Sequence, residues 1–322
     1  MQIGLEILRD NDALTFDSLA KRLRRESSIW CQSRDFLWSP FHYYGQWSKN
    51  ENMSRLVSFF QFNYINSDRN NQNHLNVTKY NKGKLSRNVI PWLLFRNRHI
   101  LVIGRSDTHL EIQDQMALRQ FGVQYIFSMN IDPITDFSVA IPLGLTNQTS
   151  ESKKHLLFGN QSHFEAAYSI APTRPGFNGS IYANFSIETA IEHRLPLHIF
   201  AKSLSSVVSD EPSFTSAGRV KYLAQLRTCN FVLAPRGNGL DTHRLWETLL
   251  MGGIPIVLRD PGLNSLLSNL PVVQVDDWAE IADKHMLKEE WNRIMEHNWS
   301  YDFLRTSYWV NQIKEKAIGK TQ

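Results

Sequence analysis

A glycine-rich turn between two apolar strands constrains this chain more than any other part of its sequence. Residues 231–234 are a short apolar run, as expected of a strand buried on both faces of a parallel sheet. Pro235 ends the run, and Gly237 and Gly239 then supply a turn whose backbone can take positive φ and approach a ligand closely. A second apolar run, 254–258, predicts the next strand. Strand, turn, helix and strand in this order are typical of an α/β domain.

The segment between these strands predicts a capped helix. Asp241 is a good N-cap, and helix is expected over 242–251. Leu245 and Leu249 are one turn apart and give the helix an apolar inner stripe. Gly252 and the glycine after it are expected to end the helix.

The polar residues of the turn and of the first helical turns predict an anion site. The helix N-terminus offers unpaired N–H groups and the positive end of its dipole. Together with Arg236 and Arg244 it suits a diphosphate, and His243 is placed to contact a phosphate or a sugar. Glu247 lies deeper on the same helix face, where its carboxylate could accept two hydrogen bonds from a ribose cis-diol. The predicted ligand is a nucleotide held by its phosphates at one end and by its sugar at the other, with no metal.

Each of these assignments has a structural alternative. Arg244 and Glu247 are three residues apart and could form a helix-surface ion pair instead. Asp241 is better explained as a helix cap than as a catalyst. Asn238 could bond a donor sugar, but asparagine in a glycine turn is commonly there because it tolerates the left-handed conformation.

The stretch FVLAPRGNGLDTHRLWETLLMGGIPIV, residues 231–257, resembles the exostosin-like glycosyltransferases. The earlier segments IPLGL at 141–145 and IYANFSIETAIEHR at 181–194 resemble the same family, most closely the branch with ribitol xylosyltransferase and bacterial capsule-type proteins. Glu247 and Gly252 also match the Glu-x-x-x-x-Gly pattern of metal-independent, two-domain sugar transferases. The resemblance does not extend to the N-terminal third. It implies a GT-B fold, a nucleotide-sugar donor bound by the C-terminal half, and inversion at the anomeric carbon.

An inverting transferase also needs a base that takes the proton of the attacking hydroxyl. In a GT-B enzyme this base is expected near the carboxyl ends of the strands of the first domain. Asp107 and His109 follow a predicted strand at 99–103, and Asp132 follows one at 125–129. All three are candidates, with ordinary loop caps as the alternative.

Length and patterning predict two α/β domains. The chain has 322 residues, whereas single cores stop growing at roughly 250–300. A helix over 111–121 and a strand over 139–143 join the strands at 99–103 and 125–129 into a βαβ unit. The polar segment 146–154 is predicted to link the domains. The predicted boundaries are therefore an acceptor-side domain at 1–148, a nucleotide-sugar-binding Rossmann-like domain at 149–290, and a helical tail at 291–322 that could return to the first domain.

Charge and cysteine content limit the classes of partner and the cellular compartment that we expect. The formal net charge is +4, and the basic run at 21–25 is best explained as the wet face of a helix, so a nucleic-acid partner is not expected. Two distant cysteines, Cys31 and Cys229, are interpreted as reduced core thiols of a cytoplasmic protein. The start carries acidic residues rather than a signal peptide, and no apolar run approaches the ~20 residues of a spanning helix, although attachment at a membrane surface remains compatible. Several Asn-x-Ser/Thr sequons leave a luminal domain open as an alternative.

The sequence therefore predicts a glycosyltransferase that moves a sugar from a UDP-linked donor to a glycan or polyol-phosphate acceptor in surface polysaccharide synthesis. One alternative is a catalytically inactive partner protein that binds a nucleotide sugar or glycan. Another is a pyruvyl or phosphosugar transferase on a similar scaffold.

Overall fold

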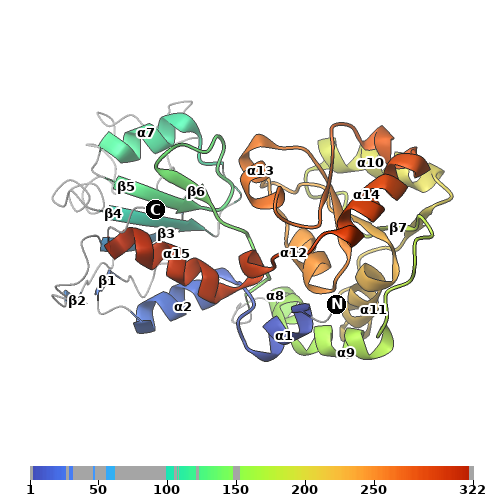
Figure 1. Ribbon diagram of the computed structural model, residues 1–322, viewed down its shortest axis with the longest axis horizontal. Coiled ribbons are helices and arrows are strands. Elements are labelled where there is room, and N and C mark those ends of the chain that lie inside the picture. The colour runs from blue at the N-terminus through green and yellow to red at the C-terminus, as the bar shows by residue number, and fades with distance from the viewer. Residues whose placement is uncertain are drawn as a thin grey trace. The chain divides into compact units, whose positions relative to one another are not determined.

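The chain folds into two compact units in a computed structural model that describes residues 3–26, 29–31, 46–47, 56–61, 99–104, 107, 109–120, 123–147 and 153–318 (Figure 1). Unit 1 comprises Met1–Ser18, Pro142–Asp260 and Asn264–Thr306, and unit 2 comprises Leu19–Ile141, Pro261–Leu263 and Ser307–Gln322. The sequence predicted boundaries after residues 148 and 290. In the structure the first 18 residues group with the C-terminal half, and the last segment of unit 2 begins only at Ser307.

Unit 1 contains a parallel five-stranded sheet in the order β8-β7-β9-β10-β11. Its strands are β7 (Ile181–Ala183), β8 (Val207–Ser209), β9 (Phe231–Leu233), β10 (Ile254–Leu258) and β11 (Val273–Val275). From β7 the chain moves outward to β8 on one side, and then returns to the other side for β9, β10 and β11. The strand order therefore reverses between β7 and β9, which makes the gap between their carboxyl ends the topological switch point of a doubly wound sheet.

Helices cover both faces of this sheet because its strands are apolar on both sides. Ile181, Phe231, Ile254 and Val273 face a core shared with α10 (Ile191–Ser203) and α14 (Lys284–Glu296). Residues that alternate with these in the strands point to the opposite face of the sheet. Tyr182, for example, lies 6.2 Å from the ring of Tyr222 on α11 (Ser216–Thr228).

The remaining helices of unit 1 pack around α11. They are α1 (Ile3–Arg9), α8 (Lys153–Gly159), α9 (Ser162–Ile170) and α12 (His243–Leu250), with contacts linking α1 to α9 and α12, and α11 to α8, α9 and α12. A 3₁₀ turn, η2 (Trp278–Ala282), leads into α14, and a second, η3 (Asp302–Leu304), follows it. Helix α13 (Pro261–Leu267) begins in unit 2 and continues in unit 1.

Backbone hydrogen bonds attach the N-terminal segment to unit 1. The N–H of Leu14 donates to Leu304 and the N–H of Leu145 donates to Leu14. Ala13 also pairs with Arg305 in an antiparallel bridge. Three segments that are distant in the sequence thus run side by side within one unit.

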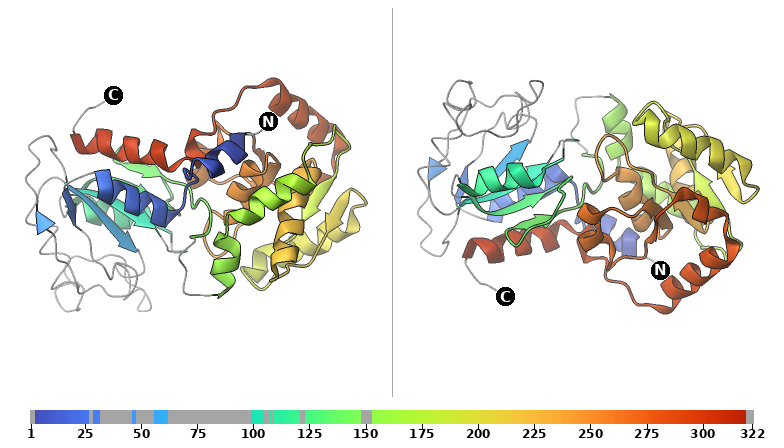
Figure 2. Two further views of the ribbon diagram at one scale, coloured as in Figure 1. Left: turned by 90° about the horizontal axis from the view of Figure 1, so that it is seen from below. Right: turned by 90° about the horizontal axis from the view of Figure 1, so that it is seen from above.

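Unit 2 is built on a sheet in the order β2-β1-β3-β4-β5-β6, in which only the pair β1–β2 is antiparallel. Its strands are β1 (Ile29–Cys31), β2 (Gln46–Trp47), β3 (Leu56–Gln61), β4 (His99–Gly104), β5 (Val123–Ser128) and β6 (Ser138–Ala140). Helix α7 (Ile112–Gln120) covers one face, and α2 (Phe16–Glu26) and α15 (Thr306–Ile318) lie on the opposite face (Figures 1 and 2). Buried Leu19 and Leu23 of α2, and Trp309 and Ile313 of α15, supply apolar packing there.

Most predicted elements are confirmed, including the four between 99 and 143 and those that flank the glycine turn. The short apolar run at 156–159, whose composition alone would also suit a strand, is the last turn of α8. Helix α10 begins at Ile191 and continues through Pro196 to Ser203. Part of the predicted linker, 148–152, lies outside the described residues. None of the helices in the described part of the chain is long and apolar enough to cross a membrane.

Candidate functional site

The carboxyl ends of β7, β8 and β9 form one edge of the sheet in unit 1, which we call the switch-point edge. It comprises the loops at 184–190, 210–215 and 234–242. Ile181 of β7 is paired with both Val207 and Phe231, so the three strands are in register and their loops emerge together. Ligands of doubly wound parallel sheets bind at such an edge, beside the point where the strand order reverses. The glycine-rich turn singled out in the sequence is one of these loops.

Arg194 of α10 ties the loops of β7 and β9 together. Its Nε donates to the carbonyl of Arg236 at 2.8 Å, its Nη1 to Ser186 at 2.9 Å and its Nη2 to Pro235 at 3.4 Å. The guanidinium is buried, and burial together with the nearby charge of Arg244 lowers its pKa to about 10. Since three backbone carbonyls receive its hydrogen bonds, Arg194 fixes the shape of the turn.

The same guanidinium explains a glycine of the turn. A Cβ on Gly237 would lie 3.3 Å from Nη2 of Arg194. Among the described glycines, positive φ occurs at Gly144, Gly179 and Gly252, and not at Gly237 or Gly239. The expectation of positive φ in the turn was therefore wrong. A side chain at position 237 would instead crowd the Arg194 guanidinium, which would have to shift by a few tenths of an ångström.

Arg236 and Arg244 add two further guanidinium groups, and both side chains are half-buried. The Arg244 guanidinium carbon lies 5.9 Å from the ring centre of Phe185, and that of Arg194 lies 6.0 Å from the same ring. The Nε of Arg244 is buried and donates to no acceptor among the described residues. Like charges so close together in a partly desolvated place favour the binding of an anion between them.

The sequence predicted Asp241 as the N-cap of α12, and this prediction is wrong. The helix begins at His243 with Thr242 as N-cap, and the Thr242 side chain makes no capping hydrogen bond. The Asp241 carboxylate turns instead to the indole Nε1 of Trp246 at 2.7 and 2.8 Å, and to the N–H groups of Leu143 at 2.7 Å and Thr242 at 2.6 Å. Burial raises the pKa of Asp241 to about 6 in spite of these donors.

His243 and the exposed tip of the turn complete this part of the edge. Nδ1 of His243 lies 2.7 Å from the carbonyl oxygen of Gly144. Because a carbonyl can only accept, Nδ1 carries the proton in this contact. Asn238 is exposed, and Gly239 beside it is buried.

Glu247 is placed differently from either sequence interpretation. Its carboxylate receives hydrogen bonds from Arg219 of α11 at 2.5 and 3.2 Å and from the hydroxyl of Tyr222 at 2.9 Å, and its side chain is only 5% exposed. The partner is thus Arg219 and not Arg244. Although burial raises the pKa of Glu247, the Arg219 guanidinium holds it below its usual value. The residue predicted to bind a ribose therefore joins two helices in the interior of unit 1.

The three candidate bases lie in unit 2, at the carboxyl edge of its sheet. Asp107 and His109 follow β4, and Asp132 follows β5. An isolated parallel bridge between Leu110 and Ile131 brings the two segments together, so that His109 and Asp132 each adjoin the bridge. Asp107 is exposed, and the other two are half-buried. All three are accessible to an acceptor from solvent.

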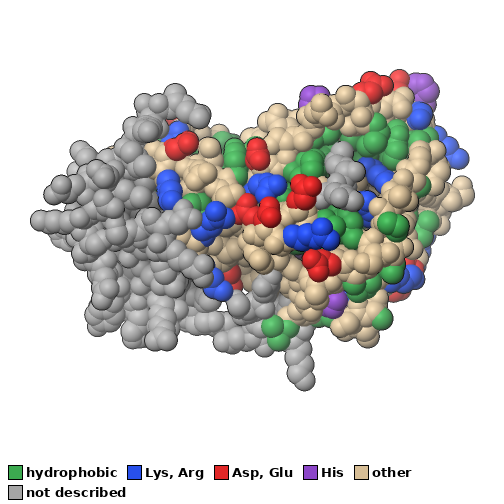
Figure 3. All heavy atoms as spheres, turned by 60° about the horizontal axis from the view of Figure 1, so that its bottom comes forward, with side chains coloured by type: hydrophobic (Ala, Val, Ile, Leu, Met, Phe, Trp, Pro, Cys, Tyr) green, Lys and Arg blue, Asp and Glu red, His purple; other side chains and the backbone are tan. Residues whose placement is uncertain are grey.

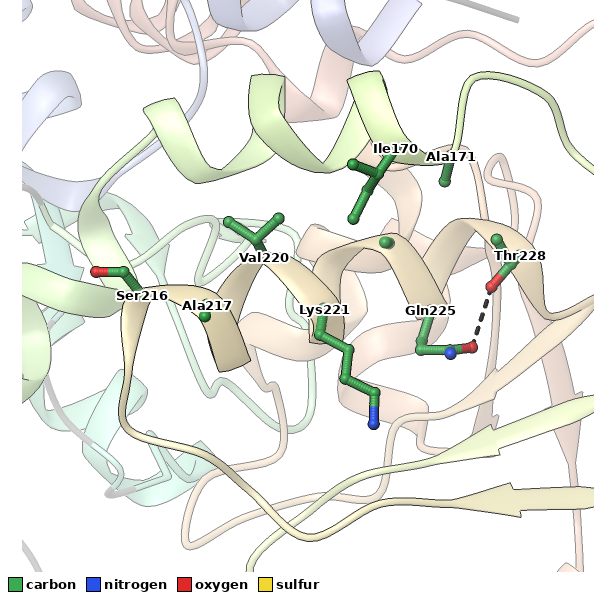
Figure 4. Close-up of a pocket in the computed structure, with 9 residues that line it drawn as sticks. Ile170, Ala171, Ser216, Ala217, Val220, Lys221, Gln225 and Thr228 are labelled. Carbon is green, nitrogen blue, oxygen red and sulfur yellow. Dashed lines mark hydrogen bonds between the residues drawn. The ribbon is translucent and has the colours of Figure 1, made fainter.

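An open depression of about 570 Å³ lies elsewhere in unit 1, between the end of α9 and α11 (Figure 4). Ile170 faces Val220 across it, whereas Lys221 points away from α9. None of the residues predicted to bind a ligand lines it. Its walls are mostly short and apolar, which does not suit a diphosphate.

On one face of the molecule, charges of the two signs are interspersed. On the face shown in Figure 3, Lys and Arg side chains lie among Asp and Glu side chains. Within the described ranges, no group of three or more His, Cys, Asp or Glu residues is arranged to hold a metal ion. Asp10 and Asp12 are two residues apart in the sequence. The carboxylate of each lies 3.7 Å from Nη1 of Arg305, so this pair has an arginine as its partner. Cys229 is a buried free thiol whose pKa is raised to about 11 by burial.

Sequence reasoning missed Arg194, whose signal was its place on the first helix after β7. Comparison with known proteins adds no further candidate. No protein-family model matches the chain, and no curated protein matches it.

Proposed function

We propose that the switch-point edge of unit 1 binds the diphosphate of a nucleotide sugar, and that the protein is a glycosyltransferase. One observation carries the proposal: the guanidinium groups of Arg194 and Arg244 lie 6.0 and 5.9 Å from the same Phe185 ring, and Arg194 binds a glycine-containing turn at the reversal point of a parallel sheet. Arg236, which is half-buried, is a residue of that turn. The buried Nε of Arg244 has no acceptor among the described residues, so a bound phosphate oxygen would supply one. The donor is a UDP-sugar, and the GT-B arrangement suggested by the sequence is part of the proposal.

The site supports the leaving group of sugar transfer. When the bond between the anomeric carbon and the diphosphate breaks, negative charge develops on the diphosphate oxygens. Arg236 and Arg244 would stabilise that charge, together with N–H groups at the start of α12, without a metal ion. A hydroxyl of a glycan or polyol-phosphate acceptor attacks the anomeric carbon from the opposite side, which inverts its configuration. Asp107, His109 or Asp132 would take the hydroxyl proton.

Calorimetry with UDP tests the anion site. Charge-assisted hydrogen bonds contribute about 1.5–3 kcal/mol, so Arg244→Ala is expected to weaken UDP binding by roughly ten- to a hundred-fold. Arg236→Ala is expected to act in the same direction. Arg259→Ala is the matched control, because Arg259 is 51% exposed and pairs with Asp276 after β10. If Arg244→Ala and Arg236→Ala both bind UDP as the wild type does, the site is wrongly assigned.

Turnover separates an enzyme from a binding protein. A transferase should lose most of its turnover of UDP-sugars in one of the variants Asp107→Asn, His109→Gln or Asp132→Asn while retaining UDP affinity. Unchanged turnover in all three would contradict the assigned bases. Binding of UDP-sugar with no transfer to any acceptor would favour an inactive partner protein. Failure to bind any nucleoside diphosphate would favour a transferase of another donor class.

A further inference from the structure

We propose that Asp210, at the carboxyl end of β8, binds the ribose hydroxyls of the nucleotide whose diphosphate lies on Arg236 and Arg244. This inference rests on the proposed function and assigns a second part of the same site. It also replaces Glu247, the residue that the sequence had indicated for the ribose.

The sheet places Asp210 on the switch-point edge. Ala183 of β7 and Ser209 of β8 are paired, and the N–H of Asp210 donates to the carbonyl of Ala183 at 3.1 Å. Neighbouring strands are about 4.8 Å apart, so β8 lies roughly 10 Å from β9, with β7 between them. In the dinucleotide-binding fold, the phosphates lie at the turn after the first strand and an acid after the second strand takes the ribose. Asp210 follows the second strand of unit 1, whereas the diphosphate is assigned to the loop of β9, on the other side of β7. What the sheet supplies is that both loops open at one edge.

The Asp210 carboxylate has acceptor capacity left for two hydroxyl groups. Its side chain is 29% exposed, and Lys221 lies 3.2 and 3.3 Å from its two oxygens. The hydroxyl of Tyr182 is a second and more distant donor, at 3.4 Å. A carboxylate has about four lone-pair sites. Lys221 is 64% exposed, and ion pairs of this kind contribute little, so a ligand can displace or share it.

Tyr182 connects this carboxylate with the arginines. Burial is the main reason that the pKa of its hydroxyl is raised, the Asp210 charge raises it further, and the Arg244 charge lowers it. The hydroxyl therefore lies within the field of both groups. A nucleotide has an anionic diphosphate for the arginine and ribose hydroxyls for the carboxylate.

Glu247 lacks the capacity that Asp210 has. Three hydrogen bonds from Arg219 and Tyr222 engage both oxygens of Glu247, and its side chain is 5% exposed. A diol would have to break a buried bidentate ion pair to reach it. Asp210 offers a carboxylate at the same edge without that cost.

Calorimetry with UDP, 2′,3′-dideoxy-UDP and pyrophosphate tests the assignment. The wild type is expected to bind UDP about ten-fold more tightly than the dideoxy analogue, which lacks both hydroxyls. Asp210→Asn should weaken UDP to the level of the analogue and leave pyrophosphate affinity unchanged. Glu211→Gln is the control, because its side chain is 77% exposed and adjacent in sequence, and it should behave as the wild type.

The outcomes separate this inference from the function on which it rests. If Asp210→Asn still prefers UDP over the dideoxy analogue as strongly as the wild type does, the inference is wrong and the diphosphate site stands. If the wild type binds neither UDP nor pyrophosphate, the proposed function fails and the inference with it. Should Asp210→Asn not fold, Tyr182→Phe replaces it, because loss of the hydroxyl that orients Asp210 should reduce the preference for UDP. An unchanged preference in that variant would likewise overturn the inference.

Discussion

Asp241 carries a buried carboxylate that holds two separate segments of unit 1 together. One oxygen accepts the N–H of Leu143, and the other accepts that of Thr242, while the Trp246 indole bridges both. Burial in this position raises the pKa to about 6, from 3.8 for an ordinary aspartate. The folded protein therefore holds this proton over a pH range in which the unfolded chain has released it.

This pKa predicts how stability depends on pH. Between pH 4 and 6 the folded state binds more protons at Asp241, so the free energy of unfolding should fall as pH rises through this window, by an amount on the order of 3 kcal/mol. Above the folded pKa this contribution is lost. Urea unfolding at several pH values should show the decline in the wild type and a smaller one in Asp241→Asn. Equal pH slopes in the two proteins would contradict the assignment.

At the scale of residues, the sequence identified the arginines of the turn but not their arrangement. Arg236 and Arg244 could be predicted because they flank a glycine turn and a helix start. Arg194 could not be assigned in this way, because its role depends on three carbonyls that only the folded loops bring to it. Glu247 fits a ligand-binding pattern in the sequence, and only tertiary packing shows that Arg219 reaches it from another helix.

Among the elements, α11 and α12 are joined by the buried cluster of Arg219, Tyr222 and Glu247. The Arg219 and Glu247 side chains are 2% and 5% exposed, so neither charge has water as a substitute partner. Breaking a buried ion pair by removing one partner costs about 3–5 kcal/mol, because the other charge stays buried and uncompensated. Glu247→Ala should therefore lower the free energy of unfolding by an amount in that range.

The matched control replaces the whole pair. The double variant Arg219→Met with Glu247→Leu leaves no buried charge and should be markedly more stable than Glu247→Ala alone. Urea unfolding of the three proteins measures the difference. A cost below about 1 kcal/mol for Glu247→Ala would show that the cluster does not hold the helices together.

The elements that the sequence predicted well are those that end at a glycine or proline. Gly252 takes a φ of 75° and ends α12 as expected. By contrast, the short apolar run in 156–159 fits a strand or a buried helix equally well. In the folded chain it continues a helix that begins at Lys153. β8 contributes just three residues, of which two are exposed, and so lacks any alternating pattern.

At the scale of the whole molecule, α1 belongs to the unit that the chain re-enters at Pro142. It packs so closely on α12 that a Cβ on Gly4 would lie 1.8 Å from the carbonyl oxygen of Leu250. No sequence pattern showed this, because the contact joins segments at opposite ends of unit 1. The same long-range pairing explains why a domain boundary read along the chain placed these residues in the wrong half.

This close approach predicts the effect of adding one methyl group. Gly4→Ala should force α1 away from α12 and lower the free energy of unfolding by about 1–3 kcal/mol, as overpacking does. Gly176→Ala is the control, since a Cβ there would meet nothing within 4 Å. Thermal or urea unfolding measures both. Equal stability of the two variants would mean that α1 is not docked on α12 in solution.

The docking of α1 also has a consequence for synthesis. Helix α1 is made well before Leu250, against which Gly4 packs. At roughly 5–20 residues per second, the apolar side of α1 waits for tens of seconds before its binding surface exists. Leu5, Ile7 and Leu8, all buried in the finished protein, are exposed on the nascent chain during that time. Chaperones that recognise short apolar helices would meet this segment before the rest of its own unit does.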